Sequence, residues 1–147
     1  MKILSKLLHS EFLKNFITCG ILGWCLEIFF TAMTSLRRRN LKLKGETSLW
    51  MFPIYGSAAL LLPVFRLLKG CSVFFRGTVY AALIYLVEYI SGYFLWSKGI
   101  CPWDYGKTKW HIHRVIRLDY LPCWFIVGLL FERILAGKSQ SFPSSER

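Results

Sequence analysis

Residues Phe16–Leu36 read FITCGILGWCLEIFFTAMTSL, a run of 21 amino acids in which Glu27 is the only charged side chain. A second run of 21, GTVYAALIYLVEYISGYFLWS at Gly77–Ser97, also carries a single charge, Glu88. Apolar segments of about 20 residues are long enough to cross the hydrocarbon core of a membrane as helices. Because each glutamate is the twelfth residue of its run, both are expected near the middle of the bilayer.

These two glutamates are the first candidate functional residues. A charge at mid-membrane costs about 2.5–3.5 kcal/mol on insertion scales, so an acid kept there points to function. Small and polar residues recur around both at spacings of three and four, typical of faces that pack against other helices. The two faces could bring Glu27 near Glu88, in which case one carboxyl would hold a proton. We interpret the pair as a site for a proton, a cation or a lipid headgroup; the alternative is two hydrogen-bonded acids that only fix helix register.

Two further segments complete a prediction of four spans. Thr47–Phe65 contains no charge, and the last segment has an uncharged centre, Tyr120–Phe131, with Asp119 before it and Glu132 after it. These two acids are candidate site residues near the membrane borders. The sequence therefore predicts an all-α integral membrane protein, a four-helix bundle with spans at about 16–36, 47–65, 77–97 and 118–136.

The two ends of the chain are predicted to lie outside this 16–136 membrane domain. Residues 1–15 place apolar side chains at helical spacing opposite Lys2, Lys6 and Lys14, which indicates an amphipathic segment on the membrane surface. No cleavable signal peptide stands out. Residues 137–147 are rich in serine and are predicted to form a polar, disordered tail.

The charge of the chain points to lipid as a partner. The net charge is +11, yet 54% of the residues are hydrophobic, and the basic residues fall in short connections between apolar runs. Arg37, Arg38 and Arg39 directly follow the first span, where anionic headgroups are the expected partner. Nucleic acid is not expected as a partner. The two faces of a four-span chain would carry nine and ten Lys or Arg, so the charge count does not orient the protein.

The start of the second predicted span carries Trp50, Pro53 and Tyr55. A proline inside a membrane helix frees backbone carbonyls, which neighbours or water must then satisfy. We interpret this segment as a broken helix that lines a site. The alternative is a kinked structural helix with aromatic anchors at the interface.

The loop before the fourth span contains Trp103, Asp104 and Tyr105, followed by His111 and His113. Its aromatic side chains are typical of the headgroup level, and Asp104 is expected to cap a turn or pair with a basic residue. No third ligand stands at motif spacing from the histidines, so no metal is predicted, and neither is a cofactor. The five cysteines contain no Cys-x-x-Cys, and we expect no disulfide framework and no zinc site.

Several short motifs follow one another along most of the chain. They are Gly20-x-x-Gly23-Trp24-x-x-Glu27, Thr47-Ser48-Leu49-Trp50 leading to Ile54-Tyr55-Gly56, Glu88-x-x-x-Gly92, Cys101-Pro102-Trp103-Asp104-Tyr105, and Leu118-Asp119-Tyr120 with Trp124-Phe125 and Glu132. In this order they resemble the transmembrane protein 229 family, which is similar to bacterial proteins named as type IV permeases of ABC transporters. The resemblance implies a multi-pass membrane fold and a link to transport. Arg114 stands where members often have glycine, and Asp119 where glutamate is also common.

Three classes of function fit these observations. The favoured one is a transport-related, permease-like membrane component in which buried carboxylates line a site. The 147 residues contain no phosphate-binding Gly-x-x-x-x-Gly-Lys-Ser/Thr, so such a component would need a homo-oligomer or a separate ATPase subunit. The alternatives are a lipid-interacting or scaffold protein, and a membrane-embedded lipid enzyme with Glu27 and Glu88, or Asp104, His111 and His113, as acid–base groups. No hydrolase motif is present, which disfavours the enzyme.

Overall fold

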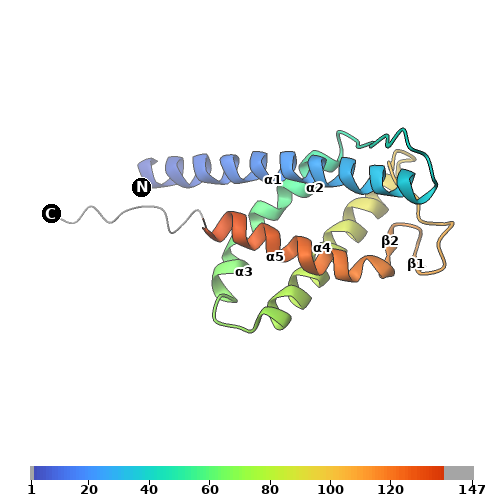
Figure 1. The fold of residues 1–147 in the computed structure, drawn as a ribbon. Coiled ribbons are helices and arrows are strands. Elements are labelled where there is room, and N and C mark those ends of the chain that lie inside the picture. The colour runs from blue at the N-terminus through green and yellow to red at the C-terminus, as the bar shows by residue number, and fades with distance from the viewer. Residues whose placement is uncertain (1, 138–147) are drawn as a thin grey trace. The chain divides into compact units, whose positions relative to one another are not determined.

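The computed structural model describes residues 2–137, which fold mainly into helices (Figure 1). In chain order the elements are α1 (Lys2–Arg37), α2 (Met51–Gly56), the 3-10 helix η1 (Ser57–Leu61), α3 (Leu62–Leu67), α4 (Val73–Ser97), the strands β1 (His111–Ile112) and β2 (Ile116–Arg117), the 3-10 helix η2 (Leu118–Tyr120) and α5 (Leu121–Gly137). The predicted all-α fold is confirmed, with a short antiparallel hairpin of β1 and β2 added. The chain divides into two compact units, residues 1–61 and 62–147. Residues 138–147 of the predicted tail lie outside the described residues.

Three helical segments are long and apolar enough to cross a membrane. They are His9–Arg37, Val73–Ser97 and Leu118–Gly137. At about 1.5 Å per residue, 20 helical residues cover the roughly 30 Å of a hydrocarbon core. The prediction of an integral membrane protein is therefore confirmed. A fourth apolar segment, Met51–Leu67, is shorter than these three, so the predicted count of four spans is approximate.

The second predicted span, 47–65, is interrupted within its length. Helix α2 begins at Met51, and the 3-10 helix η1 separates it from α3. Pro53 was interpreted as the residue that breaks the second span. It lies instead in the first turn of α2, where no intrahelical hydrogen bond requires its missing N–H, so α2 continues through it. Pro63 occupies the same kind of position in the first turn of α3, directly after the 3-10 stretch. The α-helical conformation of this span is therefore interrupted at η1, directly before the turn that contains Pro63.

The first unit is built by close packing of α1 on α2. A Cβ atom at Gly20 would lie 2.6 Å from the Phe52 ring, and one at Gly23 would overlap the Tyr55 ring. Both glycines thus let an aromatic side chain of α2 rest directly on the α1 backbone. The connection between the helices is tied to α1 by the Trp24 indole, which donates to the Ser48 carbonyl at 3.0 Å.

The second unit packs α4 against α5 and α3. Gly128 of α5 lies against Tyr80, whose fully buried ring meets Phe65 of α3 edge to face at a centroid distance of 4.8 Å. Gly77 of α4 receives the Phe125 ring in the same manner. The unit is therefore held by aromatic side chains seated on glycines, as in the first unit.

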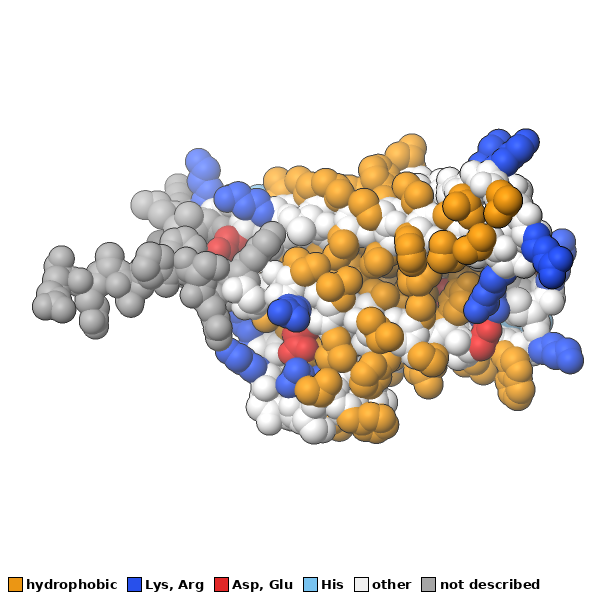
Figure 2. All heavy atoms as spheres, viewed as in Figure 1, with side chains coloured by type: hydrophobic (Ala, Val, Ile, Leu, Met, Phe, Trp, Pro, Cys, Tyr) orange, Lys and Arg blue, Asp and Glu red, His pale blue; other side chains and the backbone are white. Residues whose placement is uncertain are grey.

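Apolar side chains also cover much of the molecular surface, as Figure 2 shows for one face. Large apolar side chains with more than half of their surface exposed include Ile21, Phe29, Phe74, Leu86 and Ile126, which all lie on the three span-length segments. Large apolar side chains exposed along span-length helices mark contact with lipid or with other proteins. Lipid is the solvent that these helices require.

Candidate functional site

Glu27 of the first unit is held by a tyrosine. The Tyr55 hydroxyl of α2 donates a hydrogen bond to Glu27 Oε1 at 2.8 Å. Tyr55 is buried and Glu27 is half-buried. Gly23, one helical turn before Glu27, leaves the space in which the Tyr55 ring lies. The sequence motif that spaces Gly23 and Glu27 by four residues therefore builds one acid–tyrosine contact.

Glu88 of the second unit has a similar environment. It is 9% exposed and lies midway along α4, with the Tyr105 hydroxyl 3.4 Å from its Oε1. Gly92, one turn after Glu88, lies against the Trp103 ring and Val115. The Trp103 indole also donates to the Val115 carbonyl at 2.9 Å, which holds the loop against α4.

The two acids thus share one local design. Each carboxyl lies within a span-length helix, accepts from a tyrosine hydroxyl, and has a glycine one turn away that admits an aromatic side chain. A carboxylate in apolar surroundings needs such a donor, because an unpaired buried charge costs several kcal/mol. Glu27 and Glu88 belong to different compact units, and their mutual approach stays a prediction.

Asp104 organises the loop that carries Tyr105. Arg114 Nε donates to Asp104 Oδ1 at 2.9 Å, its Nη2 pairs with Oδ2, and the Gly106 amide adds a third bond at 2.8 Å. These bonds, those from Arg114 first, lower the pKa of the Asp104 carboxyl to about 2. The Arg114 guanidinium also lies over the Trp96 ring, 5.0 Å from its centroid. Asp104 therefore stabilises the conformation of the loop through these hydrogen bonds.

The hairpin turn next to this loop has an unusual backbone. His113 and Arg114 have φ values of 47° and 64°, and the Val115 amide closes the turn on the Ile112 carbonyl at 3.1 Å. This left-handed region favours glycine. Arg114 adopts this conformation while its side chain pairs with Asp104 and lies over the Trp96 ring.

The two histidines of this region have separate hydrogen-bond partners. His111 Nδ1 lies 2.6 Å from the Thr108 carbonyl, and His113 Nδ1 lies 3.1 Å from the Tyr89 hydroxyl. Within residues 2–137 no group of three His, Cys, Asp or Glu side chains could hold a metal ion.

The remaining predicted site residues lie at borders and on surfaces. Asp119 forms a bidentate pair with Arg117, both bonds at 2.7 Å, at the start of the last span. Glu132 pairs with Arg76 Nε at 3.1 Å, with only 13% of its side chain exposed. The other candidates are exposed: Trp50, Pro53, Arg37, Arg38 and Arg39.

The basic partners of two candidate acids, Arg117 for Asp119 and Arg76 for Glu132, were not predicted from the sequence. Arg117 stands two residues from Asp119, so this pair could have been found from spacing alone. Arg76 and Glu132 are 56 positions apart in the sequence and meet only because α4 packs against α5. No local sequence pattern predicts a contact between residues this far apart in the chain.

Comparison with known proteins agrees with the multi-pass membrane fold. No solved structure gives a significant match to this chain. A family model described as "Putative ABC-transporter type IV" matches residues 14–145, which include Glu27, Glu88 and the loop of Trp103, Asp104 and Tyr105. Because the match covers most of the chain and confirms the predicted resemblance, the protein belongs to this Putative ABC-transporter type IV family.

Proposed function

We propose that this protein is a permease-like component of a membrane transport system, in which Glu27 and Glu88 form polar sites for a proton or a cation. Membership of the family and three span-length helices fit a transport-related membrane component. The observation that carries the finer proposal is the shared design of the two acids. Each carboxyl accepts from a tyrosine hydroxyl, Tyr55 or Tyr105, that a neighbouring segment supplies.

A carboxyl group that accepts from a tyrosine hydroxyl suits a site that gains and loses a proton or a cation. A phenol hydroxyl can donate to a carboxylate and also to the carbonyl oxygen of a protonated carboxyl. A proton or cation can therefore arrive at Glu27 or Glu88 without loss of the tyrosine contact. A carboxyl that served only to fix helix packing could be replaced by an amide of the same shape at little cost.

The proposed system includes further partners. The sequence has no phosphate-binding loop, so ATP-driven transport would require a separate ATPase subunit, with which family membership is compatible. A homo-oligomer would supply more helices than one chain provides. Native mass spectrometry after gentle extraction tests both, since a co-purifying ATPase or a defined oligomer is expected and a lone monomer would contradict them.

The test of the site is the flux of protons and potassium ions into vesicles that contain the purified protein. Glu27→Gln and Glu88→Gln are each expected to reduce flux by about tenfold or more, which corresponds to ~1.4 kcal/mol. Glu11→Gln is the matched control, because Glu11 is an exposed acid on the same helix as Glu27. If both test variants insert normally and show wild-type flux, the two glutamates have at most a structural role and the proposal is wrong.

A lipid-interacting role is the second candidate. Arg37, Arg38 and Arg39 are all exposed at the end of α1, where they can reach anionic headgroups. If this role dominated, replacement of the three arginines by glutamine would change lipid association more than either glutamate substitution. Unchanged lipid association in the triple variant would exclude it.

A further inference from the structure

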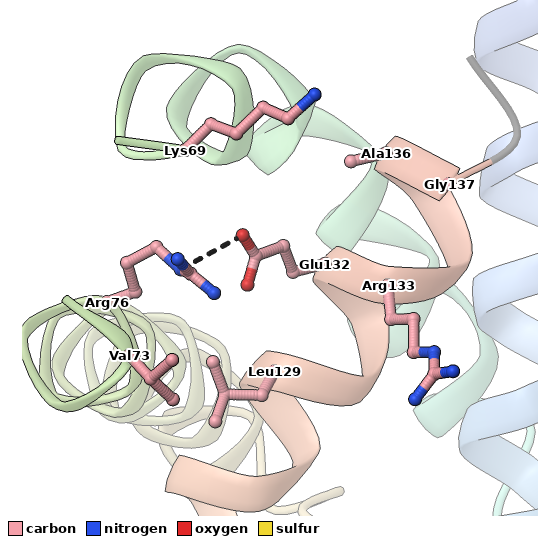
Figure 3. Close-up of a pocket in the computed structure, with 8 residues that line it drawn as sticks. All are labelled: Lys69, Val73, Arg76, Leu129, Glu132, Arg133, Ala136 and Gly137. Atoms are coloured by element: carbon pink, nitrogen blue, oxygen red, sulfur yellow. Dashed lines mark ion pairs between the residues drawn. The ribbon is translucent and has the colours of Figure 1, made fainter. Parts of the chain in front are cut away.

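A pocket of about 490 Å³ lies within the second unit, and Glu88 of the same unit is not among its lining residues (Figure 3). It is formed by the α3–α4 connection, the first turn of α4 and the last turns of α5. Its lining residues are Lys69, Val73, Arg76, Leu129, Glu132, Arg133, Ala136 and Gly137. We refer to these eight residues as the α4–α5 pocket.

The α4–α5 pocket has an excess of positive charge. Three of its residues are basic, and Glu132 is its only acid. Arg76 Nε pairs with Glu132 at 3.1 Å, and Arg76 Nη1 donates to the Cys71 carbonyl at 3.0 Å. Lys69 and Arg133 form no ion pair with any residue in the range 2–137. Figure 3 shows Lys69 extending toward the end of α5, whereas Arg133 extends away from the Arg76–Glu132 pair.

The pocket also has an apolar wall and lies where the spans end. Val73, Leu129 and Ala136 line it beside the charged groups. Val73 is the first residue of α4 and Gly137 the last of α5, so the pocket opens at the border of the apolar segments. Headgroups of lipids occupy this depth, and basic pockets between membrane helices bind anionic headgroups there.

We infer that the α4–α5 pocket binds the phosphate of an anionic phospholipid headgroup through Lys69 and Arg76. A guanidinium presents parallel donors that match two phosphate oxygens, and an ammonium adds a point charge. The apolar wall suits the glycerol and first acyl carbons of a lipid, which a free phosphate lacks. The Glu132 carboxylate competes with the ligand for Arg76. This site is independent of the transport proposal.

The competition by Glu132 gives the inference a test in which variants move in opposite directions. The full-length protein in neutral detergent is titrated with phosphatidylglycerol or with phosphatidylcholine, and bound lipid is measured by native mass spectrometry. Lys69→Gln and Arg76→Gln are each expected to weaken phosphatidylglycerol binding about fivefold, the value of one basic residue near an anionic lipid. Glu132→Gln is expected to tighten it about fivefold, because one opposing charge is removed. Lys98→Gln, at the other end of α4, should leave binding unchanged.

The outcomes separate the sources of the anion. Displacement of phosphatidylglycerol by inorganic phosphate at equal affinity would overturn the lipid assignment and leave an anion site. Equal binding by wild type and Lys69→Gln would overturn the site itself, and Lys69 is exposed, so its substitution does not threaten folding. Weaker binding in Glu132→Gln would also contradict the inference. If Arg76→Gln does not fold, Lys69→Gln and Glu132→Gln decide the question.

Discussion

At the residue scale, the glycines next to the intramembrane acids set how closely a tyrosine or tryptophan can approach. Gly23→Ala would place a Cβ atom within the space of the Tyr55 ring. Such overpacking costs about 1–3 kcal/mol, whereas alanine gains at most about 1 kcal/mol of helix propensity over glycine. We therefore expect a net loss of stability in thermal unfolding monitored by circular dichroism. Gly70→Ala is the control, since nothing lies within 4 Å of the new atom; equal melting of both variants would contradict the packing.

Asp104 provides a pH-dependent prediction at the same scale. Its pKa of about 2 lies below the ordinary value of 3.8, so the folded state favours the carboxylate. This contribution to stability is complete above about pH 4 and is lost as the pH falls toward 2. The melting temperature of wild type should exceed that of Asp104→Asn near neutral pH, and the difference should shrink between pH 4 and pH 2. A difference that stays constant down to pH 2 would show that the Arg114 contact does not stabilise the fold.

Single residues could be predicted from the sequence only where their type and position were unusual. Glu27 and Glu88 stood out because each is the only charge in a run of 21 residues. Tyr55 and Tyr105 were predicted as candidate site residues within aromatic segments. Their hydrogen bonds to Glu27 and Glu88 could not be predicted, because they depend on how the connecting loops fold back onto α1 and α4. Glu132 was predicted as an acid near a membrane border, but its partner Arg76 could not be predicted, because the two residues meet only through the packing of α4 on α5.

At the element scale, the β1–β2 hairpin combines backbone strain with side-chain contacts at Arg114. Arg114→Gly removes the contacts to Asp104 and Trp96 but relieves the left-handed backbone, whereas Arg114→Ala removes the contacts and keeps the strain. The glycine variant should therefore melt above the alanine variant, by about 2–4 °C for a chain of this size. Equal or reversed melting temperatures would mean that residue 114 is not strained.

Helices were predictable from the sequence where apolar runs are long and free of breakers. Helix α1 continues from Lys2 through both the predicted surface segment and the first span, because residues 2–19 contain neither glycine nor proline. The second span was less predictable. Its expected first residues, Thr47–Trp50, form a connection in which Ser48 is held by Trp24, and a 3-10 helix precedes Pro63. Apolar composition alone does not reveal either interruption.

At the scale of the whole molecule, the sequence establishes an integral membrane protein of helices, and the family match adds a link to transport. The count of basic residues is balanced between the two faces, so charge leaves orientation open. The relation of Glu27 to Glu88 depends on the arrangement of two compact units, which local patterns do not specify. The proposal that Glu27 and Glu88 both serve transport must therefore be tested on the intact protein in a membrane.

The most direct measurement of that claim is proton and potassium flux through the Glu27→Gln/Glu88→Gln double variant in vesicles, with a Glu11→Gln/Glu46→Gln double variant as the charge-matched control. Glu11 and Glu46 are exposed acids. We expect the test variant to fall to the flux of protein-free vesicles while it keeps wild-type helical content, and the control to retain wild-type flux. Flux in the test variant equal to that of wild type would contradict the assignment of the two intramembrane glutamates to transport.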